Sequence, residues 1–350
     1  MNDHANPPPA RKGALAPALT LMVMAPLLAE VLPGATRLSA LFVLPIEICM
    51  WGGGALLIRE AIRRWGLGWR NMLLLALALA LAEECVVQQT SLAPMVVQIK
   101  GVAYARALGV NYVYFLWALV YEAVFVVFLP VALVELLFPR RRNDPWLGPV
   151  GVTVVAAFLG LGAFLAWFSW TRIARPKVFH VPLYSPPPVA LALALLAIGG
   201  LAYAALGGMR HRLARASAPL TPPPACLAGL AGALWAALWY GLVLLGFGIA
   251  PTFPPAAAVG GGLLLSAAAA VLVSRWAAHP AWRRGHSCAV ICGTMIGAML
   301  VSFLGFIGAL RMDLYFKIAV DLAAAGGMIV LAERVRSPAD SPIGSTSSQP

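Results

Sequence analysis

Residues 73–94, LLLALALALAEECVVQQTSLAP, decide the fold class of this chain. Residues 73–82 are entirely apolar, and the whole stretch is long enough to cross a bilayer as a helix, which takes about 20 residues. Glu83 and Glu84 stand side by side near its middle. A charged side chain at that depth costs roughly 2.5–3.5 kcal/mol on insertion scales. We therefore expect a membrane-spanning helix whose two carboxyl groups face a protein interior or a watery cavity.

The composition of the whole chain has the same character. Of its 350 residues, 61% are hydrophobic and 11% are charged, and the mean hydropathy is +0.85. Soluble proteins carry about 25% charged residues, so this chain has too few to cover a water-facing surface. We predict an all-α, polytopic transmembrane helical bundle. The net charge of +12 comes from short basic clusters between apolar runs, as in membrane-flanking loops, so we expect no nucleic-acid partner.

About ten apolar runs have the length of a membrane span. They cover residues 14–32, 39–58, 72–93, 112–138, 148–168, 188–207, 225–248, 255–274, 287–310 and 312–333. With the N-terminus inside, most of the arginines and lysines fall in the inner connections, which predicts that both termini are cytoplasmic. Residues 1–13 are then a cytoplasmic tail, and the polar residues 337–350 are expected to form a disordered C-terminal tail.

The acidic residues divide the transmembrane domain, residues 14–336, into three parts. The helices within 148–310 contain none. The final helix, 312–333, contains Asp313, Lys317 and Asp321 at spacings of four. We interpret this ladder of opposite charges as structural. The helices within 14–138 carry most of the others: Glu30, Glu47, Glu83, Glu84, Glu122 and Glu135.

Some of these glutamates are predicted to share one depth in the membrane. Glu47, the Glu83–Glu84 pair and Glu122 lie near the middle of three consecutive spans, whereas Glu30 is placed near an outer surface. Consecutive helices joined by short loops are usually neighbours, so we expect a common carboxylate cluster. Burial and like charge both favour the neutral carboxyl group, so we expect at least one of the four to be protonated at neutral pH.

Polar residues beside the glutamates are the expected hydrogen-bond partners. In a continuous helix, Gln88 and Ser91 would follow Glu84 on one face, at i+4 and i+7. Tyr121 precedes Glu122 directly. The candidate binding site therefore consists of Glu47, Glu83, Glu84, Gln88, Tyr121 and Glu122.

The histidines and cysteines do not indicate a metal centre. Every histidine falls in a predicted loop, tail or span edge, and a zinc site made of carboxylates alone would be an unusual ligand set. Cys288 and Cys292, four apart on one helical face, are interpreted as packing residues. The sequence therefore predicts no metal ligand, no cofactor and no catalytic residue.

Residues 83–88, EECVVQ, resemble the first motif of the CPBP intramembrane proteases (the CAAX-protease and bacteriocin-processing group), which reads Glu-Glu-x-x-x-Arg. The resemblance implies that the glutamates activate water and that the next helix supplies a metal-binding histidine. Here Gln88 stands in the place of the arginine, the next helix offers Tyr121-Glu122, and the later His-x-x-x-Asn/Asp motif is missing. The segments around IRE, RRWGLGW and LAEE also resemble a group of bacterial multi-pass membrane proteins, which implies no activity.

These patterns favour a transporter or permease-like protein of the bacterial cytoplasmic membrane, surrounded by the lipid bilayer. Its midplane carboxyl groups would bind a proton, a cation or a small polar substrate. Two other interpretations stay open. One is a degenerate CPBP-type protease-like protein, although an enzymatic role is less favoured. The other is a non-catalytic membrane scaffold, whose protonated glutamates hydrogen-bond helices together.

Overall fold

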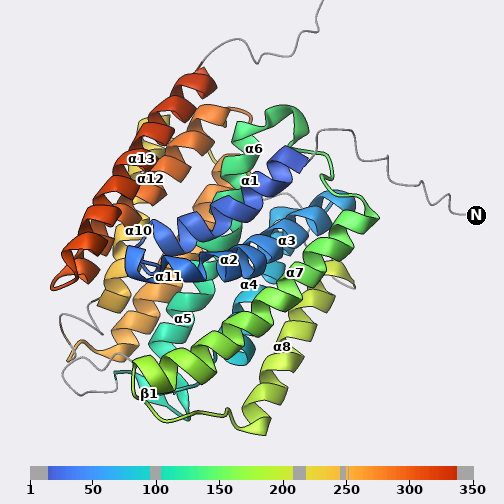
Figure 1. Cartoon of the computed structure of the whole chain (residues 1–350). Coiled ribbons are helices and arrows are strands. Elements are labelled where there is room, and N and C mark those ends of the chain that lie inside the picture. The colour runs from blue at the N-terminus through green and yellow to red at the C-terminus, as the bar shows by residue number, and fades with distance from the viewer. Residues whose placement is uncertain (1–14, 95–103, 208–217, 245–249, 251, 337–350) are drawn as a thin grey trace, which may run out of the picture.

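The computed structural model describes residues 15–94, 104–207, 218–244, 250 and 252–336. This part of the chain is nearly all helical, with one two-stranded antiparallel hairpin of β1 (Arg106–Ala107) and β2 (Val110–Asn111). The prediction of a helical bundle is therefore confirmed (Figure 1). The two predicted tails, residues 1–13 and 337–350, lie outside the described residues.

Eight of the described helices are long and apolar enough to cross a membrane. They are Leu38–Arg64, Tyr112–Leu137, Pro149–Val178, Pro188–Leu206, Ala225–Leu242, Pro255–Ala277, Arg284–Phe306 and Arg311–Arg336. A shorter apolar helix covers Leu15–Val31. Another helical stretch covers residues 69–87 and carries Glu83 and Glu84. The chain is compatible with a membrane-embedded protein.

The first two helical stretches form a hairpin, coloured blue, that passes through the middle of the molecule (Figure 1). The descending arm ends in a π-helical segment, and a 3-10 turn leads into the returning arm. The elements are α1 (Leu15–Pro26), η1 (Leu27–Val31), η2 (Leu38–Val43), α2 (Leu44–Glu47), η3 (Ile48–Gly52) and α3 (Gly53–Arg64). A Cβ on Gly52 would lie 2.1 Å from the carbonyl oxygen of Met22, so the two arms touch backbone to backbone there.

The next two stretches also contain π-helical segments. One is formed by α4 (Trp69–Leu81) and η4 (Ala82–Val87), and the other by α5 (Tyr112–Tyr121), η5 (Glu122–Phe128) and α6 (Leu129–Leu137), followed by the short turn η6 (Pro139–Arg141). The helix predicted over 72–93 thus ends early, at Val87, and the chain continues without helix through residues 88–94.

The remaining helices surround this centre. They are α7 (Pro149–Trp167), η7 (Phe168–Val178), α8 (Pro188–Leu206), α10 (Ala225–Leu244), α11 (Pro255–Ala277), α12 (Arg284–Ser302), η9 (Phe303–Phe306) and α13 (Arg311–Arg336). In Figure 1, α7 and α8 lie on one side of the molecule, and α10, α12 and α13 lie on the other. The helix predicted over 148–168 runs on through η7, into what was expected to be a loop.

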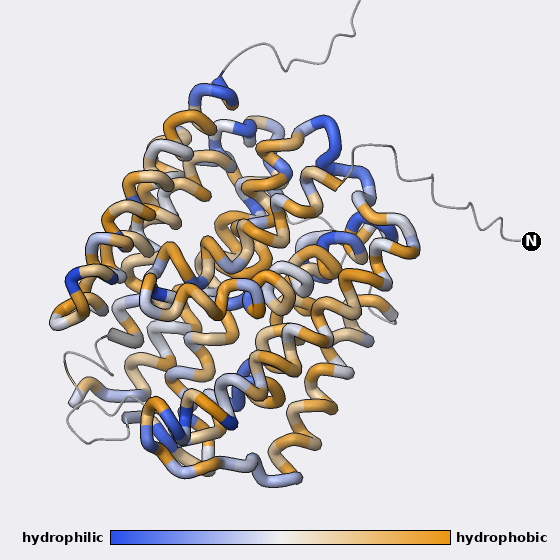
Figure 2. The backbone as a smooth tube through the Cα atoms, viewed as in Figure 1, coloured by the Kyte–Doolittle hydropathy of each residue, from blue (hydrophilic) through white to orange (hydrophobic). Residues whose placement is uncertain are grey.

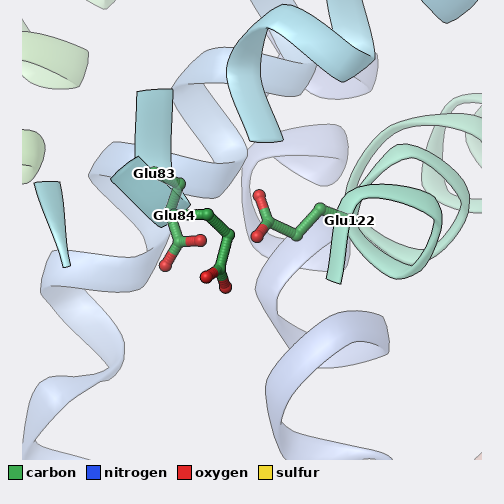
Figure 3. Close-up of side chains that lie close together, drawn as sticks. All are labelled: Glu83, Glu84 and Glu122. Carbon is green, nitrogen blue, oxygen red and sulfur yellow. The ribbon is translucent and has the colours of Figure 1, made fainter. Parts of the chain in front are cut away.

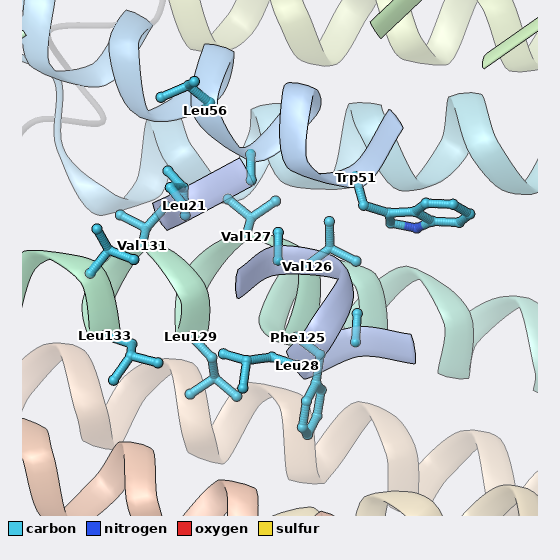
Figure 4. Packing of buried hydrophobic residues seen from close by; sticks show 14 of the residues in the cluster. Leu21, Leu28, Trp51, Leu56, Phe125, Val126, Val127, Leu129, Val131 and Leu133 are labelled. Carbon is cyan, nitrogen blue, oxygen red and sulfur yellow. The ribbon is translucent and has the colours of Figure 1, made fainter. Parts of the chain in front are cut away.

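The main apolar core lies where the blue hairpin meets η5 and α6 (Figure 4). Its fully buried side chains include Leu21, Leu56 and Phe125. The outer helices instead expose apolar side chains, for example Leu196 of α8 and Leu264 of α11. Figure 2 shows apolar residues along these helices and hydrophilic ones gathered at many helix ends. Such a surface suits a lipid environment.

The helices α10 and α12 pack unusually closely because glycines face backbone across the contact. A Cβ on Gly293 would lie 1.9 Å from the carbonyl oxygen of Gly229, and one on Gly297 would lie 2.2 Å from that of Ala233. Gly293 and Gly297 are four residues apart, the small-xxx-small spacing that lets membrane helices approach.

Hydrogen bonds connect the final helix, α13, to the turn of the blue hairpin. Lys317 is 1% exposed, donates to the carbonyl oxygen of Leu32 at 2.8 Å, and forms a 2.7 Å ion pair with Asp321. Asp313 does not complete the expected ion ladder. Its carboxylate accepts hydrogen bonds from the backbone N–H of Ser39 at 2.9 Å and from the Ser39 hydroxyl at 3.0 Å.

A buried ionic network lies at the C-terminal end of α3, away from the turn of the hairpin. Arg59, which is 1% exposed, lies between Glu60 and Glu135 and stacks 3.5 Å over the ring of Trp146. Its guanidinium also donates to three backbone carbonyl oxygens of the following connection, those of Arg141, Arg142 and Asp144. The network fixes the connection between α6 and α7.

Candidate carboxylate site

Three glutamates from two helices meet inside the molecule. Glu83 and Glu84 lie on η4, and Glu122 is the first residue of η5. One carboxylate oxygen from each lies within 4.8 Å of those from the other two, and all three residues are at most 6% exposed. Figure 3 shows the Glu122 carboxyl group pointing across the gap between the helices towards Glu83 and Glu84.

The π-helical segments explain how adjacent residues share this site. Successive side chains of an α-helix point about 100° apart, so an α-helix would turn one of Glu83 and Glu84 away. A π turn closes its hydrogen bond one residue later and contains more residues, which brings neighbouring side chains closer in direction. The segment η4 contains both glutamates, and both reach the cluster.

The acidic residues in and beside the cluster lie in or next to such segments, whereas Glu60 and Glu135 of the Arg59 network lie in α-helix. Glu30 lies in η1, Glu47 directly precedes η3, and Glu122 begins η5. π-helical turns are rare and frequently occur at functional sites. Their repeated coincidence with the buried acids marks this region as the candidate site.

Hydrogen bonds hold Glu84 in place. The Ser91 hydroxyl donates to Oε2 of Glu84 at 2.5 Å, and the Tyr114 hydroxyl donates to Oε1 at 3.3 Å. Glu83 is within hydrogen-bonding reach of both Glu84 and Glu122. Because an ionised carboxylate only accepts, each of these carboxyl–carboxyl contacts needs a shared proton or a cation between the groups.

Two carboxylate oxygens near the site have no partner. Oε2 of Glu122 and Oε2 of Glu47 are buried, and neither accepts a hydrogen bond from any described residue. Buried polar atoms are normally satisfied, because an unsatisfied one costs roughly 1–3 kcal/mol. The Glu122 oxygen is therefore a place where a ligand would gain binding energy.

Glu30 belongs to this region although its position in the sequence placed it near an outer surface. The backbone folds back directly after it, with the N–H of Thr36 donating to the carbonyl oxygen of Glu30 at 2.9 Å. Glu30 is half-buried and interacts electrostatically with Glu47, Glu83 and Glu84. Apart from being an acid in an apolar run, it carries no sequence signal that would place it here.

The other predicted site residues lie around the cluster and not within it. Glu47 accepts a hydrogen bond from the Thr36 hydroxyl and lies within electrostatic range of Glu30. Tyr121 donates to the carbonyl oxygen of Ala29, so it supports the Glu30 segment and does not bond Glu122. Gln88 follows the end of the helix and is half-buried, and its side chain makes no hydrogen bond within the described chain.

The non-helical residues 88–94 are held by side chains from elsewhere. Gln89 adopts a left-handed backbone conformation, with φ of 60°, where the helix stops. Beyond it, Asn111, Arg106 and Arg175 donate to the backbone carbonyls of Thr90, Ser91, Leu92, Ala93 and Pro94. This scaffold keeps the Ser91 hydroxyl against Glu84.

No basic side chain neutralises these acids. Within the part of the chain that the structure describes, no lysine, arginine or histidine forms a salt bridge with Glu30, Glu47, Glu83, Glu84 or Glu122. Arg59 and Lys317, which are as deeply buried, pair with other carboxylates. The site therefore collects negative charge and oxygen ligands, which suits proton exchange or binding of a cation.

Searches against protein-family models, characterised proteins and solved structures find no match to this chain. Its role is therefore argued from its own geometry. Together, the eight apolar helices and the buried acids are compatible with a multi-pass membrane protein that has an internal carboxylate site.

Proposed function

We propose that this chain is a transporter or permease-like protein of the bacterial cytoplasmic membrane. Its buried carboxylate site binds a proton or a cation on the way across the membrane. The observation that carries the proposal is the meeting of Glu122 with Glu83 and Glu84, without a basic partner. Acids within a membrane are costly, and they typically mark ion pathways and proton relays.

The proposed topology has ten membrane helices and both termini in the cytoplasm. Eight are the long apolar helices, and the other two are Leu15–Val31 and residues 69–87. The second of these is the stretch that carries Glu83 and Glu84. An even number of crossings returns the chain to the side on which it began, in agreement with the basic residues of the inner connections.

The early end of the third helix supports a transport role. The helix that carries Glu83 and Glu84 stops at Val87, and irregular backbone follows. Irregular backbone at membrane depth is tolerated where it is buried in protein or lines a cavity. Secondary transporters likewise use irregular backbone at the end of a helical segment to form their ion sites.

Flux measurements on the purified protein in liposomes test the proposal. The wild-type protein should dissipate a pH gradient, which an enclosed pH-sensitive dye reports. It should also let Mn²⁺ enter, which quenching of an enclosed fluorophore reports. Glu84→Gln and Glu122→Gln should abolish this flux. The matched control is Glu333→Gln, which changes an exposed glutamate at the end of α13. Equal flux in the wild type and both site variants would contradict transport through this site.

A hydrolase of the CPBP kind is the second candidate. It is favoured by one observation: the helix after the Glu83–Glu84 pair brings Glu122 to it, at the place where that family supplies a metal-binding histidine. Stoichiometric zinc in the purified protein, with cleavage of a membrane peptide that is lost in Glu84→Gln, would support this candidate over transport. In a scaffold, the same variants would change thermal stability and no activity.

A further inference from the structure

We infer that Glu83, Glu84 and Glu122 form a binding site for one divalent, oxygen-preferring cation of the Mn²⁺, Mg²⁺ or Ca²⁺ class. The inference rests on the proposed function and specifies its ligand. It places the ion between η4 and η5, with the half-buried Glu30 on the side of the first helix.

The spacing of the three oxygens fits one coordination shell. Ca²⁺ binds oxygen at about 2.3–2.6 Å, so two of its ligands lie at most about 5 Å apart, and Mg²⁺, at about 2.0–2.1 Å, allows about 4.2 Å. The three carboxylate oxygens all lie within 4.8 Å of one another. These separations are close to those of a Ca²⁺-sized shell, so each carboxyl group would move inward by at most a few tenths of an ångström to bind Ca²⁺, and by more to bind the smaller ions.

The carboxyl group of Glu122, which points into this space, has one unpartnered oxygen. Oε2 of Glu122 is buried without a hydrogen-bond partner among the described residues, and the residue is 6% exposed. Figure 3 shows this carboxyl group directed at Glu83 and Glu84. An acidic cluster alone could be held together by protons, but this oxygen accepts no hydrogen bond from any described residue and is therefore available as a ligand atom.

The charge balance favours a divalent ion over a monovalent one. Three carboxylates meet without a salt bridge, and one monovalent ion would leave two of the negative charges uncompensated. A divalent ion compensates two of the three, and the hydroxyl groups of Ser91 and Tyr114 stabilise Glu84 by hydrogen bonds. Partners of this kind orient metal ligands and tune their affinity.

The donor set gives the class of ion. The three converging side chains are all carboxylates, and those that hydrogen-bond Glu84 are hydroxyls. Hard oxygen ligands select Mg²⁺, Ca²⁺ and Mn²⁺, whereas zinc sites generally contain imidazole or thiolate. This preference separates the inference from the zinc hydrolase considered above.

The test uses the full-length protein in detergent, stripped of metal with EDTA and then dialysed. Mn²⁺ is titrated, and free Mn²⁺ is followed by its electron paramagnetic resonance signal. We expect one Mn²⁺ bound per chain, displaced by Ca²⁺ or Mg²⁺, and a melting temperature that rises with Mn²⁺. Glu122→Gln should weaken Mn²⁺ binding at least about tenfold, while Glu333→Gln should leave it unchanged.

A second readout separates a ligand from a structural residue. Glu122→Gln keeps the size of the side chain but removes one of three crowded acids, so it should raise the melting temperature of the metal-free protein while removing the Mn²⁺-induced rise. A merely structural glutamate would lower the melting temperature and leave Mn²⁺ binding intact. No Mn²⁺ bound at millimolar concentration, or binding indifferent to Glu122→Gln, would overturn the inference.

The outcomes distinguish this inference from the proposed function. Glu122-dependent Mn²⁺ binding without flux in liposomes would support the metal site and contradict transport. Glu122-dependent proton flux without Mn²⁺ binding would support transport and overturn the metal site.

Discussion

The front part of the molecule, residues 15–147, and the following part, residues 149–306, are built from equally apolar helices and are stabilised differently. In the front part, half of the best apolar window of Leu38–Arg64 and 67% of that of Tyr112–Leu137 are buried. In the following part the share is 11% for both Pro188–Leu206 and Pro255–Ala277, whereas Arg284–Phe306, which packs against the core, reaches half. Apolar content therefore does not tell which helices form the centre.

The difference lies in where polar groups are placed. The front part buries Glu47, Glu83, Glu84 and Glu122, together with the Arg59 network. The following part has no acidic residue, and α10 and α12 pack through glycine backbone contacts. We interpret the front part as the functional centre and the following part as its lipid-facing surround. Substitutions in the two parts should therefore lower the stability of the protein for different reasons.

The largest effect is expected at Arg59. Arg59→Met removes a buried cation from Glu60 and Glu135 and takes one donor from each of three backbone carbonyls, although that of Arg141 still accepts from the Trp146 indole N–H. Breaking a buried ion pair on one side typically costs about 3–5 kcal/mol, so the melting temperature of the purified protein should fall strongly.

The control for Arg59 lies one turn away. Arg63 contacts the same Glu135, but its side chain is 30% exposed. This pair is partly exposed, and solvent weakens ion pairs, so Arg63→Met should lower the melting temperature less than Arg59→Met. Equal losses in the two variants would show that burial does not set the strength of this network.

A smaller loss is expected in the following part, at Gly293. Gly293→Val places a branched side chain against the carbonyl oxygen of Gly229, and overpacking of this kind costs about 1–3 kcal/mol. Thermal unfolding followed by tryptophan fluorescence is a suitable measurement, because Trp235 and Trp239 lie on the same helix as Gly229. Gly260→Val is the control, since a Cβ there meets no atom within 4 Å. Indistinguishable melting curves would contradict the backbone contact between α10 and α12.

The smallest effect is expected at Ser91. Ser91→Ala removes the hydroxyl that donates to Glu84, and one such hydrogen bond contributes about 1 kcal/mol. Thr153→Ala is the matched control, because that hydroxyl is exposed and bonds only to the backbone of its own helix. The two melting temperatures should differ by a few degrees. Their equality would mean that Ser91 does not hold Glu84 in place.

Much of the helical pattern could be predicted from the sequence because long apolar runs leave little choice. The run predicted over 112–138 is observed as Tyr112–Leu137, and that over 188–207 as Pro188–Leu206. The meeting of Glu83, Glu84 and Glu122 agrees with the cluster predicted from their positions in consecutive apolar runs, whereas Glu47, predicted to share it, lies beside it.

The remainder of the site depends on contacts that local sequence does not contain. The end of the third helix at Val87 depends on Asn111 and Arg106, which hold the following backbone from a distant part of the chain. A π turn and an α turn bury the same residues when every face is apolar, so the pattern does not reveal η4. The position of Glu30 depends on how the hairpin folds back after Val31.

The bond between Lys317 and the carbonyl oxygen of Leu32 joins positions 285 residues apart. During synthesis at about 5–20 residues per second, the ribosome needs roughly 15–60 s to make that intervening length. During that interval the N-terminal hairpin lacks its hydrogen bond from Lys317. Glu30 lies two residues before Leu32, the residue that accepts this bond. The turn of the hairpin therefore gains this contact only late in translation, and a chain terminated before Lys317 would lack it.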